Sequence, residues 1–68
     1  MDRRVLTNRE KEIFTLLTQN KTTKEIANKL NISEKTVRNH ISNTMQKLGV
    51  KGRAGAVVEL IKLNEISL

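Results

Sequence analysis

The stretch from Ser33 to Leu48 constrains the fold of this chain more than any other part of the sequence. Within it, Val37, Ile41, Met45 and Leu48 recur at spacings of four, four and three, which predicts a helix with one apolar stripe. Ser33 can cap this helix, because its hydroxyl accepts a hydrogen bond from an otherwise unpaired backbone N–H group. The opposite face is expected to carry basic, amide and hydroxyl groups and no acid: Lys35, Arg38, Asn39, Ser42 and Gln46. Such a face suits contacts with base edges and phosphates, although an ordinary solvated face has the same composition.

The length and composition exclude several classes of protein. A chain of 68 residues is one domain near the lower size limit for folding on a hydrophobic core. It has no cysteine, so disulfides and thiolate metal sites are excluded, and neither a metal nor a cofactor is expected. Phe14 is the only aromatic residue, which leaves no stacking surface for single-stranded nucleic acid. His40 is the only general base at neutral pH and is expected to be structural, so no enzyme is predicted.

The charge is distributed unevenly. The net charge of the whole chain is +6, with +4 over residues 33–53 and −1 over residues 54–68. This concentration of positive charge favours a polyanionic partner. A membrane surface is the rival, but no segment combines a basic face with a strongly apolar one, and the sequence has no signal peptide or membrane-spanning run. We therefore expect a cytoplasmic protein with no membrane partner.

Capping signals predict the remaining helices. Thr7 and Thr22 are each followed three residues later by a glutamate, which is the pattern of a capping box. Together with Gly49 as a stop signal, these residues predict an all-α fold of four helices over residues 8–19, 23–30, 34–48 and 53–63. Residues 1–6 are expected to form an N-terminal arm, and residues 7–68 the domain. The three-residue turn before the third helix makes the second and third helices a helix-turn-helix.

Two expectations concern the burial of apolar side chains. In the first helix, Ile13, Leu16 and Leu17 are expected to face the core, with Phe14 at its margin. In the last helix, apolar residues span an arc of about 220°, whereas a stripe of about 100° is enough for one buried face. The surplus predicts an interface, although scattered exposed aliphatic side chains are also common.

Four motifs, in order and at these spacings, resemble those of the LuxR-type helix-turn-helix family. They are Leu6-Thr7-x-Arg9-Glu10-x-Glu12-Ile13, Lys24-Glu25-Ile26-Ala27, Ile32-Ser33-x-x-Thr36-Val37-x-x-His40-Ile41 and Lys47-Leu48-Gly49-Val50. The resemblance implies a third helix that enters the major groove of duplex DNA and a fourth helix that pairs two protomers. It places base contacts at Arg38, Asn39 and Ser42, and DNA-backbone contacts at Thr23, Lys35, Thr36 and Lys51. Its dimer positions are Ala54, Val58 and Ile61.

The sequence departs from the family pattern at three positions. Ser42 stands where many relatives carry lysine or arginine, which implies weaker or water-mediated readout of the base there. Asn20 stands where glycine is usual. Gly55 stands where a helix former is usual, and it is expected to weaken the first turn of the last helix by up to about 1 kcal/mol.

The expected function is sequence-specific binding of double-stranded DNA by a homodimer that regulates transcription. The stretches TTKEIA, ISEKTVRNHIS and MQKLGVKGR resemble a stand-alone regulator of spore-forming bacteria, which implies control of late sporulation genes and RNA polymerase as a further partner. One alternative is the output domain of a larger response regulator, which the presence of Met1 and the lack of a receiver segment disfavour. Another is a sigma-factor-like module that associates with polymerase.

Overall fold

The computed structural model describes residues 6–67, which form four α-helices and no strand. The helices are α1 (Asn8–Thr18), α2 (Thr23–Leu30), α3 (Glu34–Leu48) and α4 (Arg53–Lys62). This is the all-α arrangement expected from the sequence, with α1 and α4 each ending one residue earlier than predicted. Of the arm over residues 1–6, only Leu6 lies within the described residues, and its side chain is buried.

The first two helices begin at capping boxes. The Thr7 hydroxyl accepts a hydrogen bond from the Glu10 amide at 3.2 Å, and the Thr7 amide donates to Glu10 Oε1 at 2.9 Å. Thr22 and Glu25 make the same pair of hydrogen bonds at 3.1 and 2.8 Å. Each box satisfies two backbone N–H groups that a helix N-terminus leaves unpaired. The start of both helices is therefore determined locally.

All four helices end in the same way, with one residue in the left-handed conformation. These residues have φ angles between 58° and 69° and are Asn20, Asn31, Gly49 and Asn64. The amide that follows each of them donates to the carbonyl five residues earlier, as Ile32 does to Ala27 at 3.0 Å. These bonds satisfy carbonyl groups that the helix ends leave open. Asparagine performs this role where the chain has no glycine.

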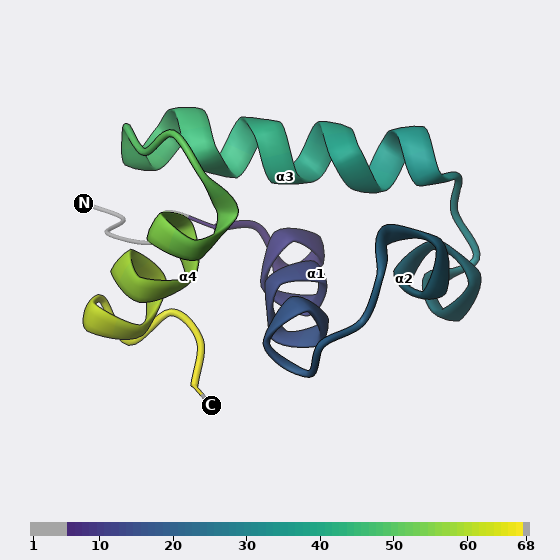
Figure 1. The fold of residues 1–68 in the computed structure, drawn as a ribbon, viewed down its shortest axis with the longest axis horizontal. Coiled ribbons are helices and arrows are strands. Elements are labelled where there is room, and N and C mark those ends of the chain that lie inside the picture. The colour runs from purple at the N-terminus through teal and green to yellow at the C-terminus, as the bar shows by residue number, and fades with distance from the viewer. Residues whose placement is uncertain (1–5, 68) are drawn as a thin grey trace.

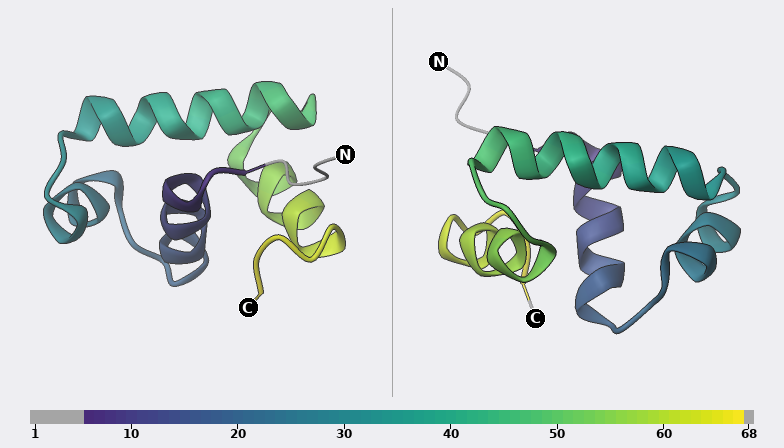
Figure 2. Two further views of the ribbon diagram at one scale, coloured as in Figure 1. Left: turned by 180° about the vertical axis from the view of Figure 1, so that it is seen from behind. Right: turned by 45° about the horizontal axis from the view of Figure 1, so that its top comes forward.

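Helix α3 lies across the other three helices and packs against each of them. Figures 1 and 2 show α1 in the middle of the row beneath α3, with α2 on one side and α4 on the other. The side of α3 that faces away from this row is not covered by any other helix. The domain therefore presents its longest helix, of 15 residues, along one edge.

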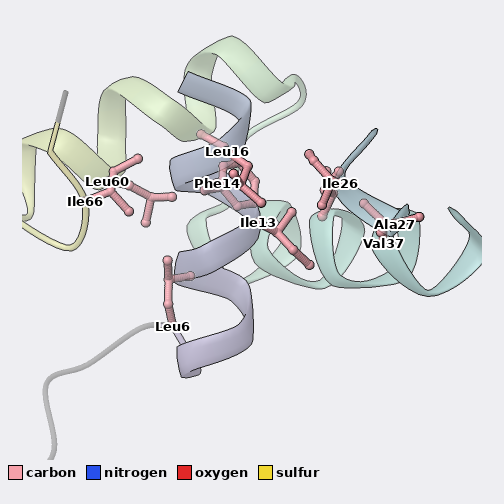
Figure 3. Packing of buried hydrophobic residues seen from close by; sticks show 11 residues of the cluster. Leu6, Ile13, Phe14, Leu16, Ile26, Ala27, Val37, Leu60 and Ile66 are labelled. Carbon is pink, nitrogen blue, oxygen red and sulfur yellow. The ribbon is translucent and has the colours of Figure 1, made fainter. Parts of the chain in front are cut away.

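The core is centred on α1, and here one expectation from the sequence is wrong. Phe14 is completely buried rather than marginal, while Leu17 is only partly buried. Figure 3 shows Phe14 and Ile13 between Leu60 on the α4 side and Ile26 on the α2 side. A helix with neighbours on three sides buries a wider arc than an amphipathic stripe, which is why the helical wheel placed Phe14 incorrectly.

A partly buried ion pair joins α1 to the C-terminal half of α3. Glu10 is only 3% exposed, and its Oε1 accepts a hydrogen bond from Lys47 Nζ at 2.7 Å. Burial acts to raise the pKa of Glu10, but the hydrogen bonds from Lys47 and Thr7 and the charge of Lys47 outweigh it. The pKa is therefore lowered from its ordinary value of 4.5. The N-terminal cap of α1 and the end of α3 are thus fixed by one carboxylate.

This pair is expected to make stability depend on acid pH. Because the folded state lowers the pKa of Glu10, the stabilisation is present above pH 4.5 and is lost as the pH falls through the lower folded-state value. Glu10→Gln should cost about 1–2 kcal/mol at pH 7, since Lys47 is partly exposed and its charge is screened. The same variant should also make the free energy of unfolding depend less on pH in the acid range. Urea unfolding between pH 3 and 7 measures both effects. Glu12→Gln, which removes an exposed acid from the same helix, is the control, and an equal loss in both variants would contradict the assignment.

Candidate nucleic-acid interface

The outer face of α3 carries the residue types expected from the sequence. Its inward side chains Val37, Ile41 and Thr44 are buried. The side chains of the opposite face are all exposed, and they are Lys35, Arg38, Asn39, Ser42 and Gln46. The three predicted base-contacting residues are therefore exposed and lie opposite the buried stripe of α3. Figure 1 shows that no other helix covers the side of α3 that faces away from the row. An exposed α-helix fits into the major groove of B-DNA, which is about 12 Å wide.

The N-terminus of α3 orients one of the predicted DNA-backbone contacts. The Ser33 hydroxyl accepts a hydrogen bond from the Thr36 amide at 3.0 Å and donates its own proton to Thr36 Oγ1 at 2.9 Å. Because Thr36 Oγ1 already accepts a proton, its own hydrogen is available for another acceptor. A phosphate oxygen near a helix N-terminus is an acceptor of this kind. Ser33 thus both caps the helix and positions Thr36.

The other predicted DNA-backbone contacts lie at the two ends of α3 and beside it. Lys35 is exposed in the first turn of α3, and Lys51 is exposed in the turn that follows the helix. At 1.5 Å per residue, about 20 Å of helix separates them. Thr23 is the first residue of α2 and is partly buried. The two lysines therefore flank the face that carries Arg38, Asn39 and Ser42.

None of the five side chains expected on this face is acidic, but a carboxylate lies directly beside it. Glu34 Oε1 lies 3.6 Å from Arg38 Nη1, one helical turn away, and both side chains are about half exposed. The spacing of four residues between an acid and an arginine could have indicated this pair from the sequence. The Glu10–Lys47 pair had no such signal, because 37 residues separate its members. Two of the basic side chains of α3 are thus engaged by carboxylates of the same chain.

Helix α4 leaves part of its apolar arc uncovered. Ala56 and Leu60 are completely buried against the core, and Ile61 is partly buried. Ala54 is exposed, and Val58 is 52% exposed. Within residues 6–67, Val58 and Leu63 are the two large apolar residues that are exposed. The three predicted dimer residues thus adjoin one another at spacings of four and three, and the surface they form is open. We call Ala54, Val58 and Ile61 the α4 apolar edge.

Three further observations concern the only histidine, metal-binding clusters and membrane-spanning helices. His40 is partly buried on the side of α3, and its carbonyl accepts a hydrogen bond from the Thr44 hydroxyl at 2.9 Å. Within residues 6–67, no three His, Asp or Glu side chains gather in a way that could hold a metal ion. None of the described helices is long and apolar enough to cross a membrane.

Residues 4–60 match the family described as bacterial regulatory proteins, luxR family. The chain is 70% identical over 64 residues to the spore germination protein GerE of Bacillus subtilis, an alignment that covers 94% of this chain and 86% of that protein. It is also 50% identical over 58 residues to the transcriptional regulatory protein DegU of Brevibacillus brevis, of which it spans only 25%.

The fold is also that of a solved relative. The structure of the transcription factor GerE superposes on this chain with a TM-score of 0.93 and 62% identity, and the alignment covers 96% of this chain and 97% of that one. Sequence, fold and the exposed face of α3 lead to one conclusion. The chain belongs to the LuxR family of bacterial regulatory proteins and is a DNA-binding regulator of transcription with a LuxR-type helix-turn-helix fold.

Proposed function

We propose that this regulator reads its DNA site with the outer face of α3 and binds as a homodimer through α4. The observation that carries the proposal is the uncovered outer face of α3, on which basic and amide side chains are exposed together. Arg38 is assigned to a guanine, because its guanidinium can donate two hydrogen bonds to O6 and N7. Asn39 is assigned to an adenine edge or a phosphate. Ser42 has a short side chain, so its contact is expected to be weaker or bridged by water.

The register on the DNA would be fixed by contacts with the sugar–phosphate backbone. Lys35 and Lys51 are both exposed near the two ends of α3, and each would contact a phosphate. Thr36 and Thr23 lie in the first turns of α3 and α2, where backbone N–H groups also favour phosphates. Contacts of this kind strengthen binding to every sequence without selecting one.

A dimer accounts for the exposed α4 apolar edge. Pairing Ala54, Val58 and Ile61 with the same residues of a second copy would bury apolar side chains that are otherwise open to water. A two-fold axis through such an interface would present two copies of α3 to inverted half-sites about one helical turn, roughly 34 Å, apart. The site would then be an inverted repeat of two half-sites.

The regulated genes are proposed to be late sporulation genes, because the 70% identical relative is a spore germination protein. The protein would act in the bacterial cytoplasm, on the nucleoid, with RNA polymerase as a candidate partner. Deleting the gene in its source organism and measuring transcripts through sporulation tests this role. Unchanged late transcripts, or a source that forms no spores, would contradict it.

A second candidate is that the chain is the output domain of a longer regulator. The relatives named as response regulators are several times longer than the aligned region, as with YgeK of Escherichia coli, of which the chain spans 36%. Mass spectrometry of the native product distinguishes the two cases. A mass near 7.7 kDa supports the stand-alone regulator, and a larger one supports the output domain.

Arg38→Ala tests the reading assignment directly. It should weaken binding to the cognate duplex by about 1–3 kcal/mol and relax discrimination at one base pair. The half-site is first obtained by selection from random duplexes, and affinities are then measured on every single-base variant. Lys35→Ala is the matched control, since loss of a phosphate contact should weaken all sequences alike and lower the salt slope by about 1. If Arg38→Ala behaves in the same way as Lys35→Ala, then Arg38 contacts phosphate rather than a base.

A further inference from the structure

The ion pair between Glu34 and Arg38 places an acid where a DNA-binding surface would ordinarily exclude one. Glu34 lies in the first turn of α3, and its side chain is 45% exposed, so DNA bound to the outer face of α3 would bring phosphates near it. A negative charge there repels every duplex, whatever its sequence. For capping the helix, the site also has Ser33, whose hydroxyl already accepts from the Thr36 amide. A carboxylate in the first turn also favours the helix dipole, as Glu10 and Glu25 do in α1 and α2, and its contact with Arg38 is a second consequence of its position.

The carboxylate of Glu34 lies near the Arg38 guanidinium without occupying its hydrogen-bond donors. One terminal nitrogen, Nη1, lies 3.6 Å from one carboxylate oxygen, and the Arg38 side chain remains 55% exposed. A guanidinium has five N–H donors, so a contact through one nitrogen leaves donors for a guanine O6 and N7. The pair can therefore persist while Arg38 reads a base.

Holding the arginine in advance has a physical consequence for recognition. A long flexible side chain loses rotamer freedom when it is fixed in a complex, and a contact that already restrains it in the free protein reduces that loss. The same carboxylate disfavours alternative positions of the guanidinium next to phosphate, because the carboxylate and the phosphate repel one another. The two effects both favour the base edge over the DNA backbone as the partner of Arg38.

We propose that Glu34 is a specificity-determining residue that positions Arg38 for a base edge of duplex DNA. This inference rests on the proposed reading role of Arg38. Glu34 itself touches no base: it restrains the guanidinium and keeps it away from phosphates. It raises affinity for the cognate site and lowers affinity for unrelated sequences. Removing it should therefore reduce the ratio of the two affinities.

The test compares binding to the selected half-site duplex and to a scrambled duplex of equal length at fixed salt. Glu34→Gln keeps the side-chain shape but removes the charge, and it should weaken cognate binding about three- to tenfold. Binding of the same variant to the scrambled duplex should be unchanged or tighter. Glu34→Asp keeps the charge but shortens the side chain by one methylene, and it should also weaken cognate binding. Glu12→Gln, on α1, is the control for a change of net charge.

Two results would overturn the proposal. If Glu34→Gln tightens binding to both duplexes by the same factor, the carboxylate only repels DNA. The second test uses the double variant that combines Glu34→Gln with Arg38→Ala. Without Arg38, Glu34→Gln should no longer weaken cognate binding. If the loss persists, Glu34 acts on something other than Arg38, and the proposal is wrong. Failure of the underlying reading role looks different, because Arg38→Ala alone would then weaken both duplexes equally. Circular dichroism of each variant checks that α3 remains folded.

Discussion

Replacing Phe14 with alanine is expected to leave most of the protein unfolded at 37 °C. Phe14 is completely buried in the middle of the core, between side chains from α2 and α4 (Figure 3). Truncating a buried phenylalanine costs about 3–5 kcal/mol, because apolar contact is lost and a cavity remains. A domain of this length has a total stability of only about 3–10 kcal/mol. The loss should appear in urea unfolding followed by circular dichroism, and DNA binding should fall with the folded fraction.

Two variants make the Phe14 result interpretable. Phe14→Leu keeps most of the buried volume and should lose clearly less stability than Phe14→Ala. Leu17→Ala removes an apolar side chain from the same helix at a partly exposed position, and it should also be the milder change. If Phe14→Ala shifts the urea midpoint no more than Leu17→Ala does, then Phe14 does not occupy the centre of the core.

Val58→Glu is expected to abolish cooperative binding to two half-sites while leaving the fold intact. Val58 is 52% exposed, so a glutamate is tolerated in the monomer. In a two-fold interface through the α4 apolar edge, however, the two introduced carboxylates would lie near one another and repel. The apolar contact made by Val58 would also be lost. Loss of the link between two binding modules lowers overall affinity by about a hundredfold or more. Titration of duplexes that carry one or two half-sites measures the effect.

Leu63→Glu is the matched control for Val58→Glu. Leu63 is 48% exposed at the C-terminal end of α4 and lies on a different side of the helix from Val58. The same change from an apolar to an acidic side chain should therefore leave cooperativity intact. Single-half-site affinity should be nearly the same in both variants and in the wild type. Retained cooperativity in Val58→Glu would remove the α4 apolar edge from the interface.

The sequence was sufficient for the parts of the fold that are determined by local chemistry. Thr7 and Thr22 begin α1 and α2, and Gly49 ends α3, because each acts on backbone groups within a few residues of itself. The polar face of α3 was predictable for the same reason: a helical period fixes which side chains share a face. These features need no knowledge of what the helices pack against.

The candidate site was predictable only in part. The exposure of Arg38, Asn39 and Ser42 follows from the period of α3. The acid beside Arg38 was missed, although a spacing of four residues places Glu34 and Arg38 next to one another on the helix surface. Glu34 lies one turn before Arg38, and both side chains extend far enough to meet. The outer face of α3 is therefore bordered by an acid as well as by basic side chains.

By itself, the sequence determined four helices, the caps at Thr7, Thr22, Ser33 and Gly49, and the identity of the helix that presents a basic face. Only the tertiary structure decided that α1 occupies the middle of the row beneath α3, which buries Phe14 completely and brings Glu10 within 2.7 Å of Lys47 (Figure 1). It also decided that α4 lies at the end of that row, which leaves Val58 exposed. The physical reason is that helix formation depends on hydrogen bonds within about four residues. Burial, in contrast, depends on how many neighbours surround a helix, and that number is a property of the assembled fold.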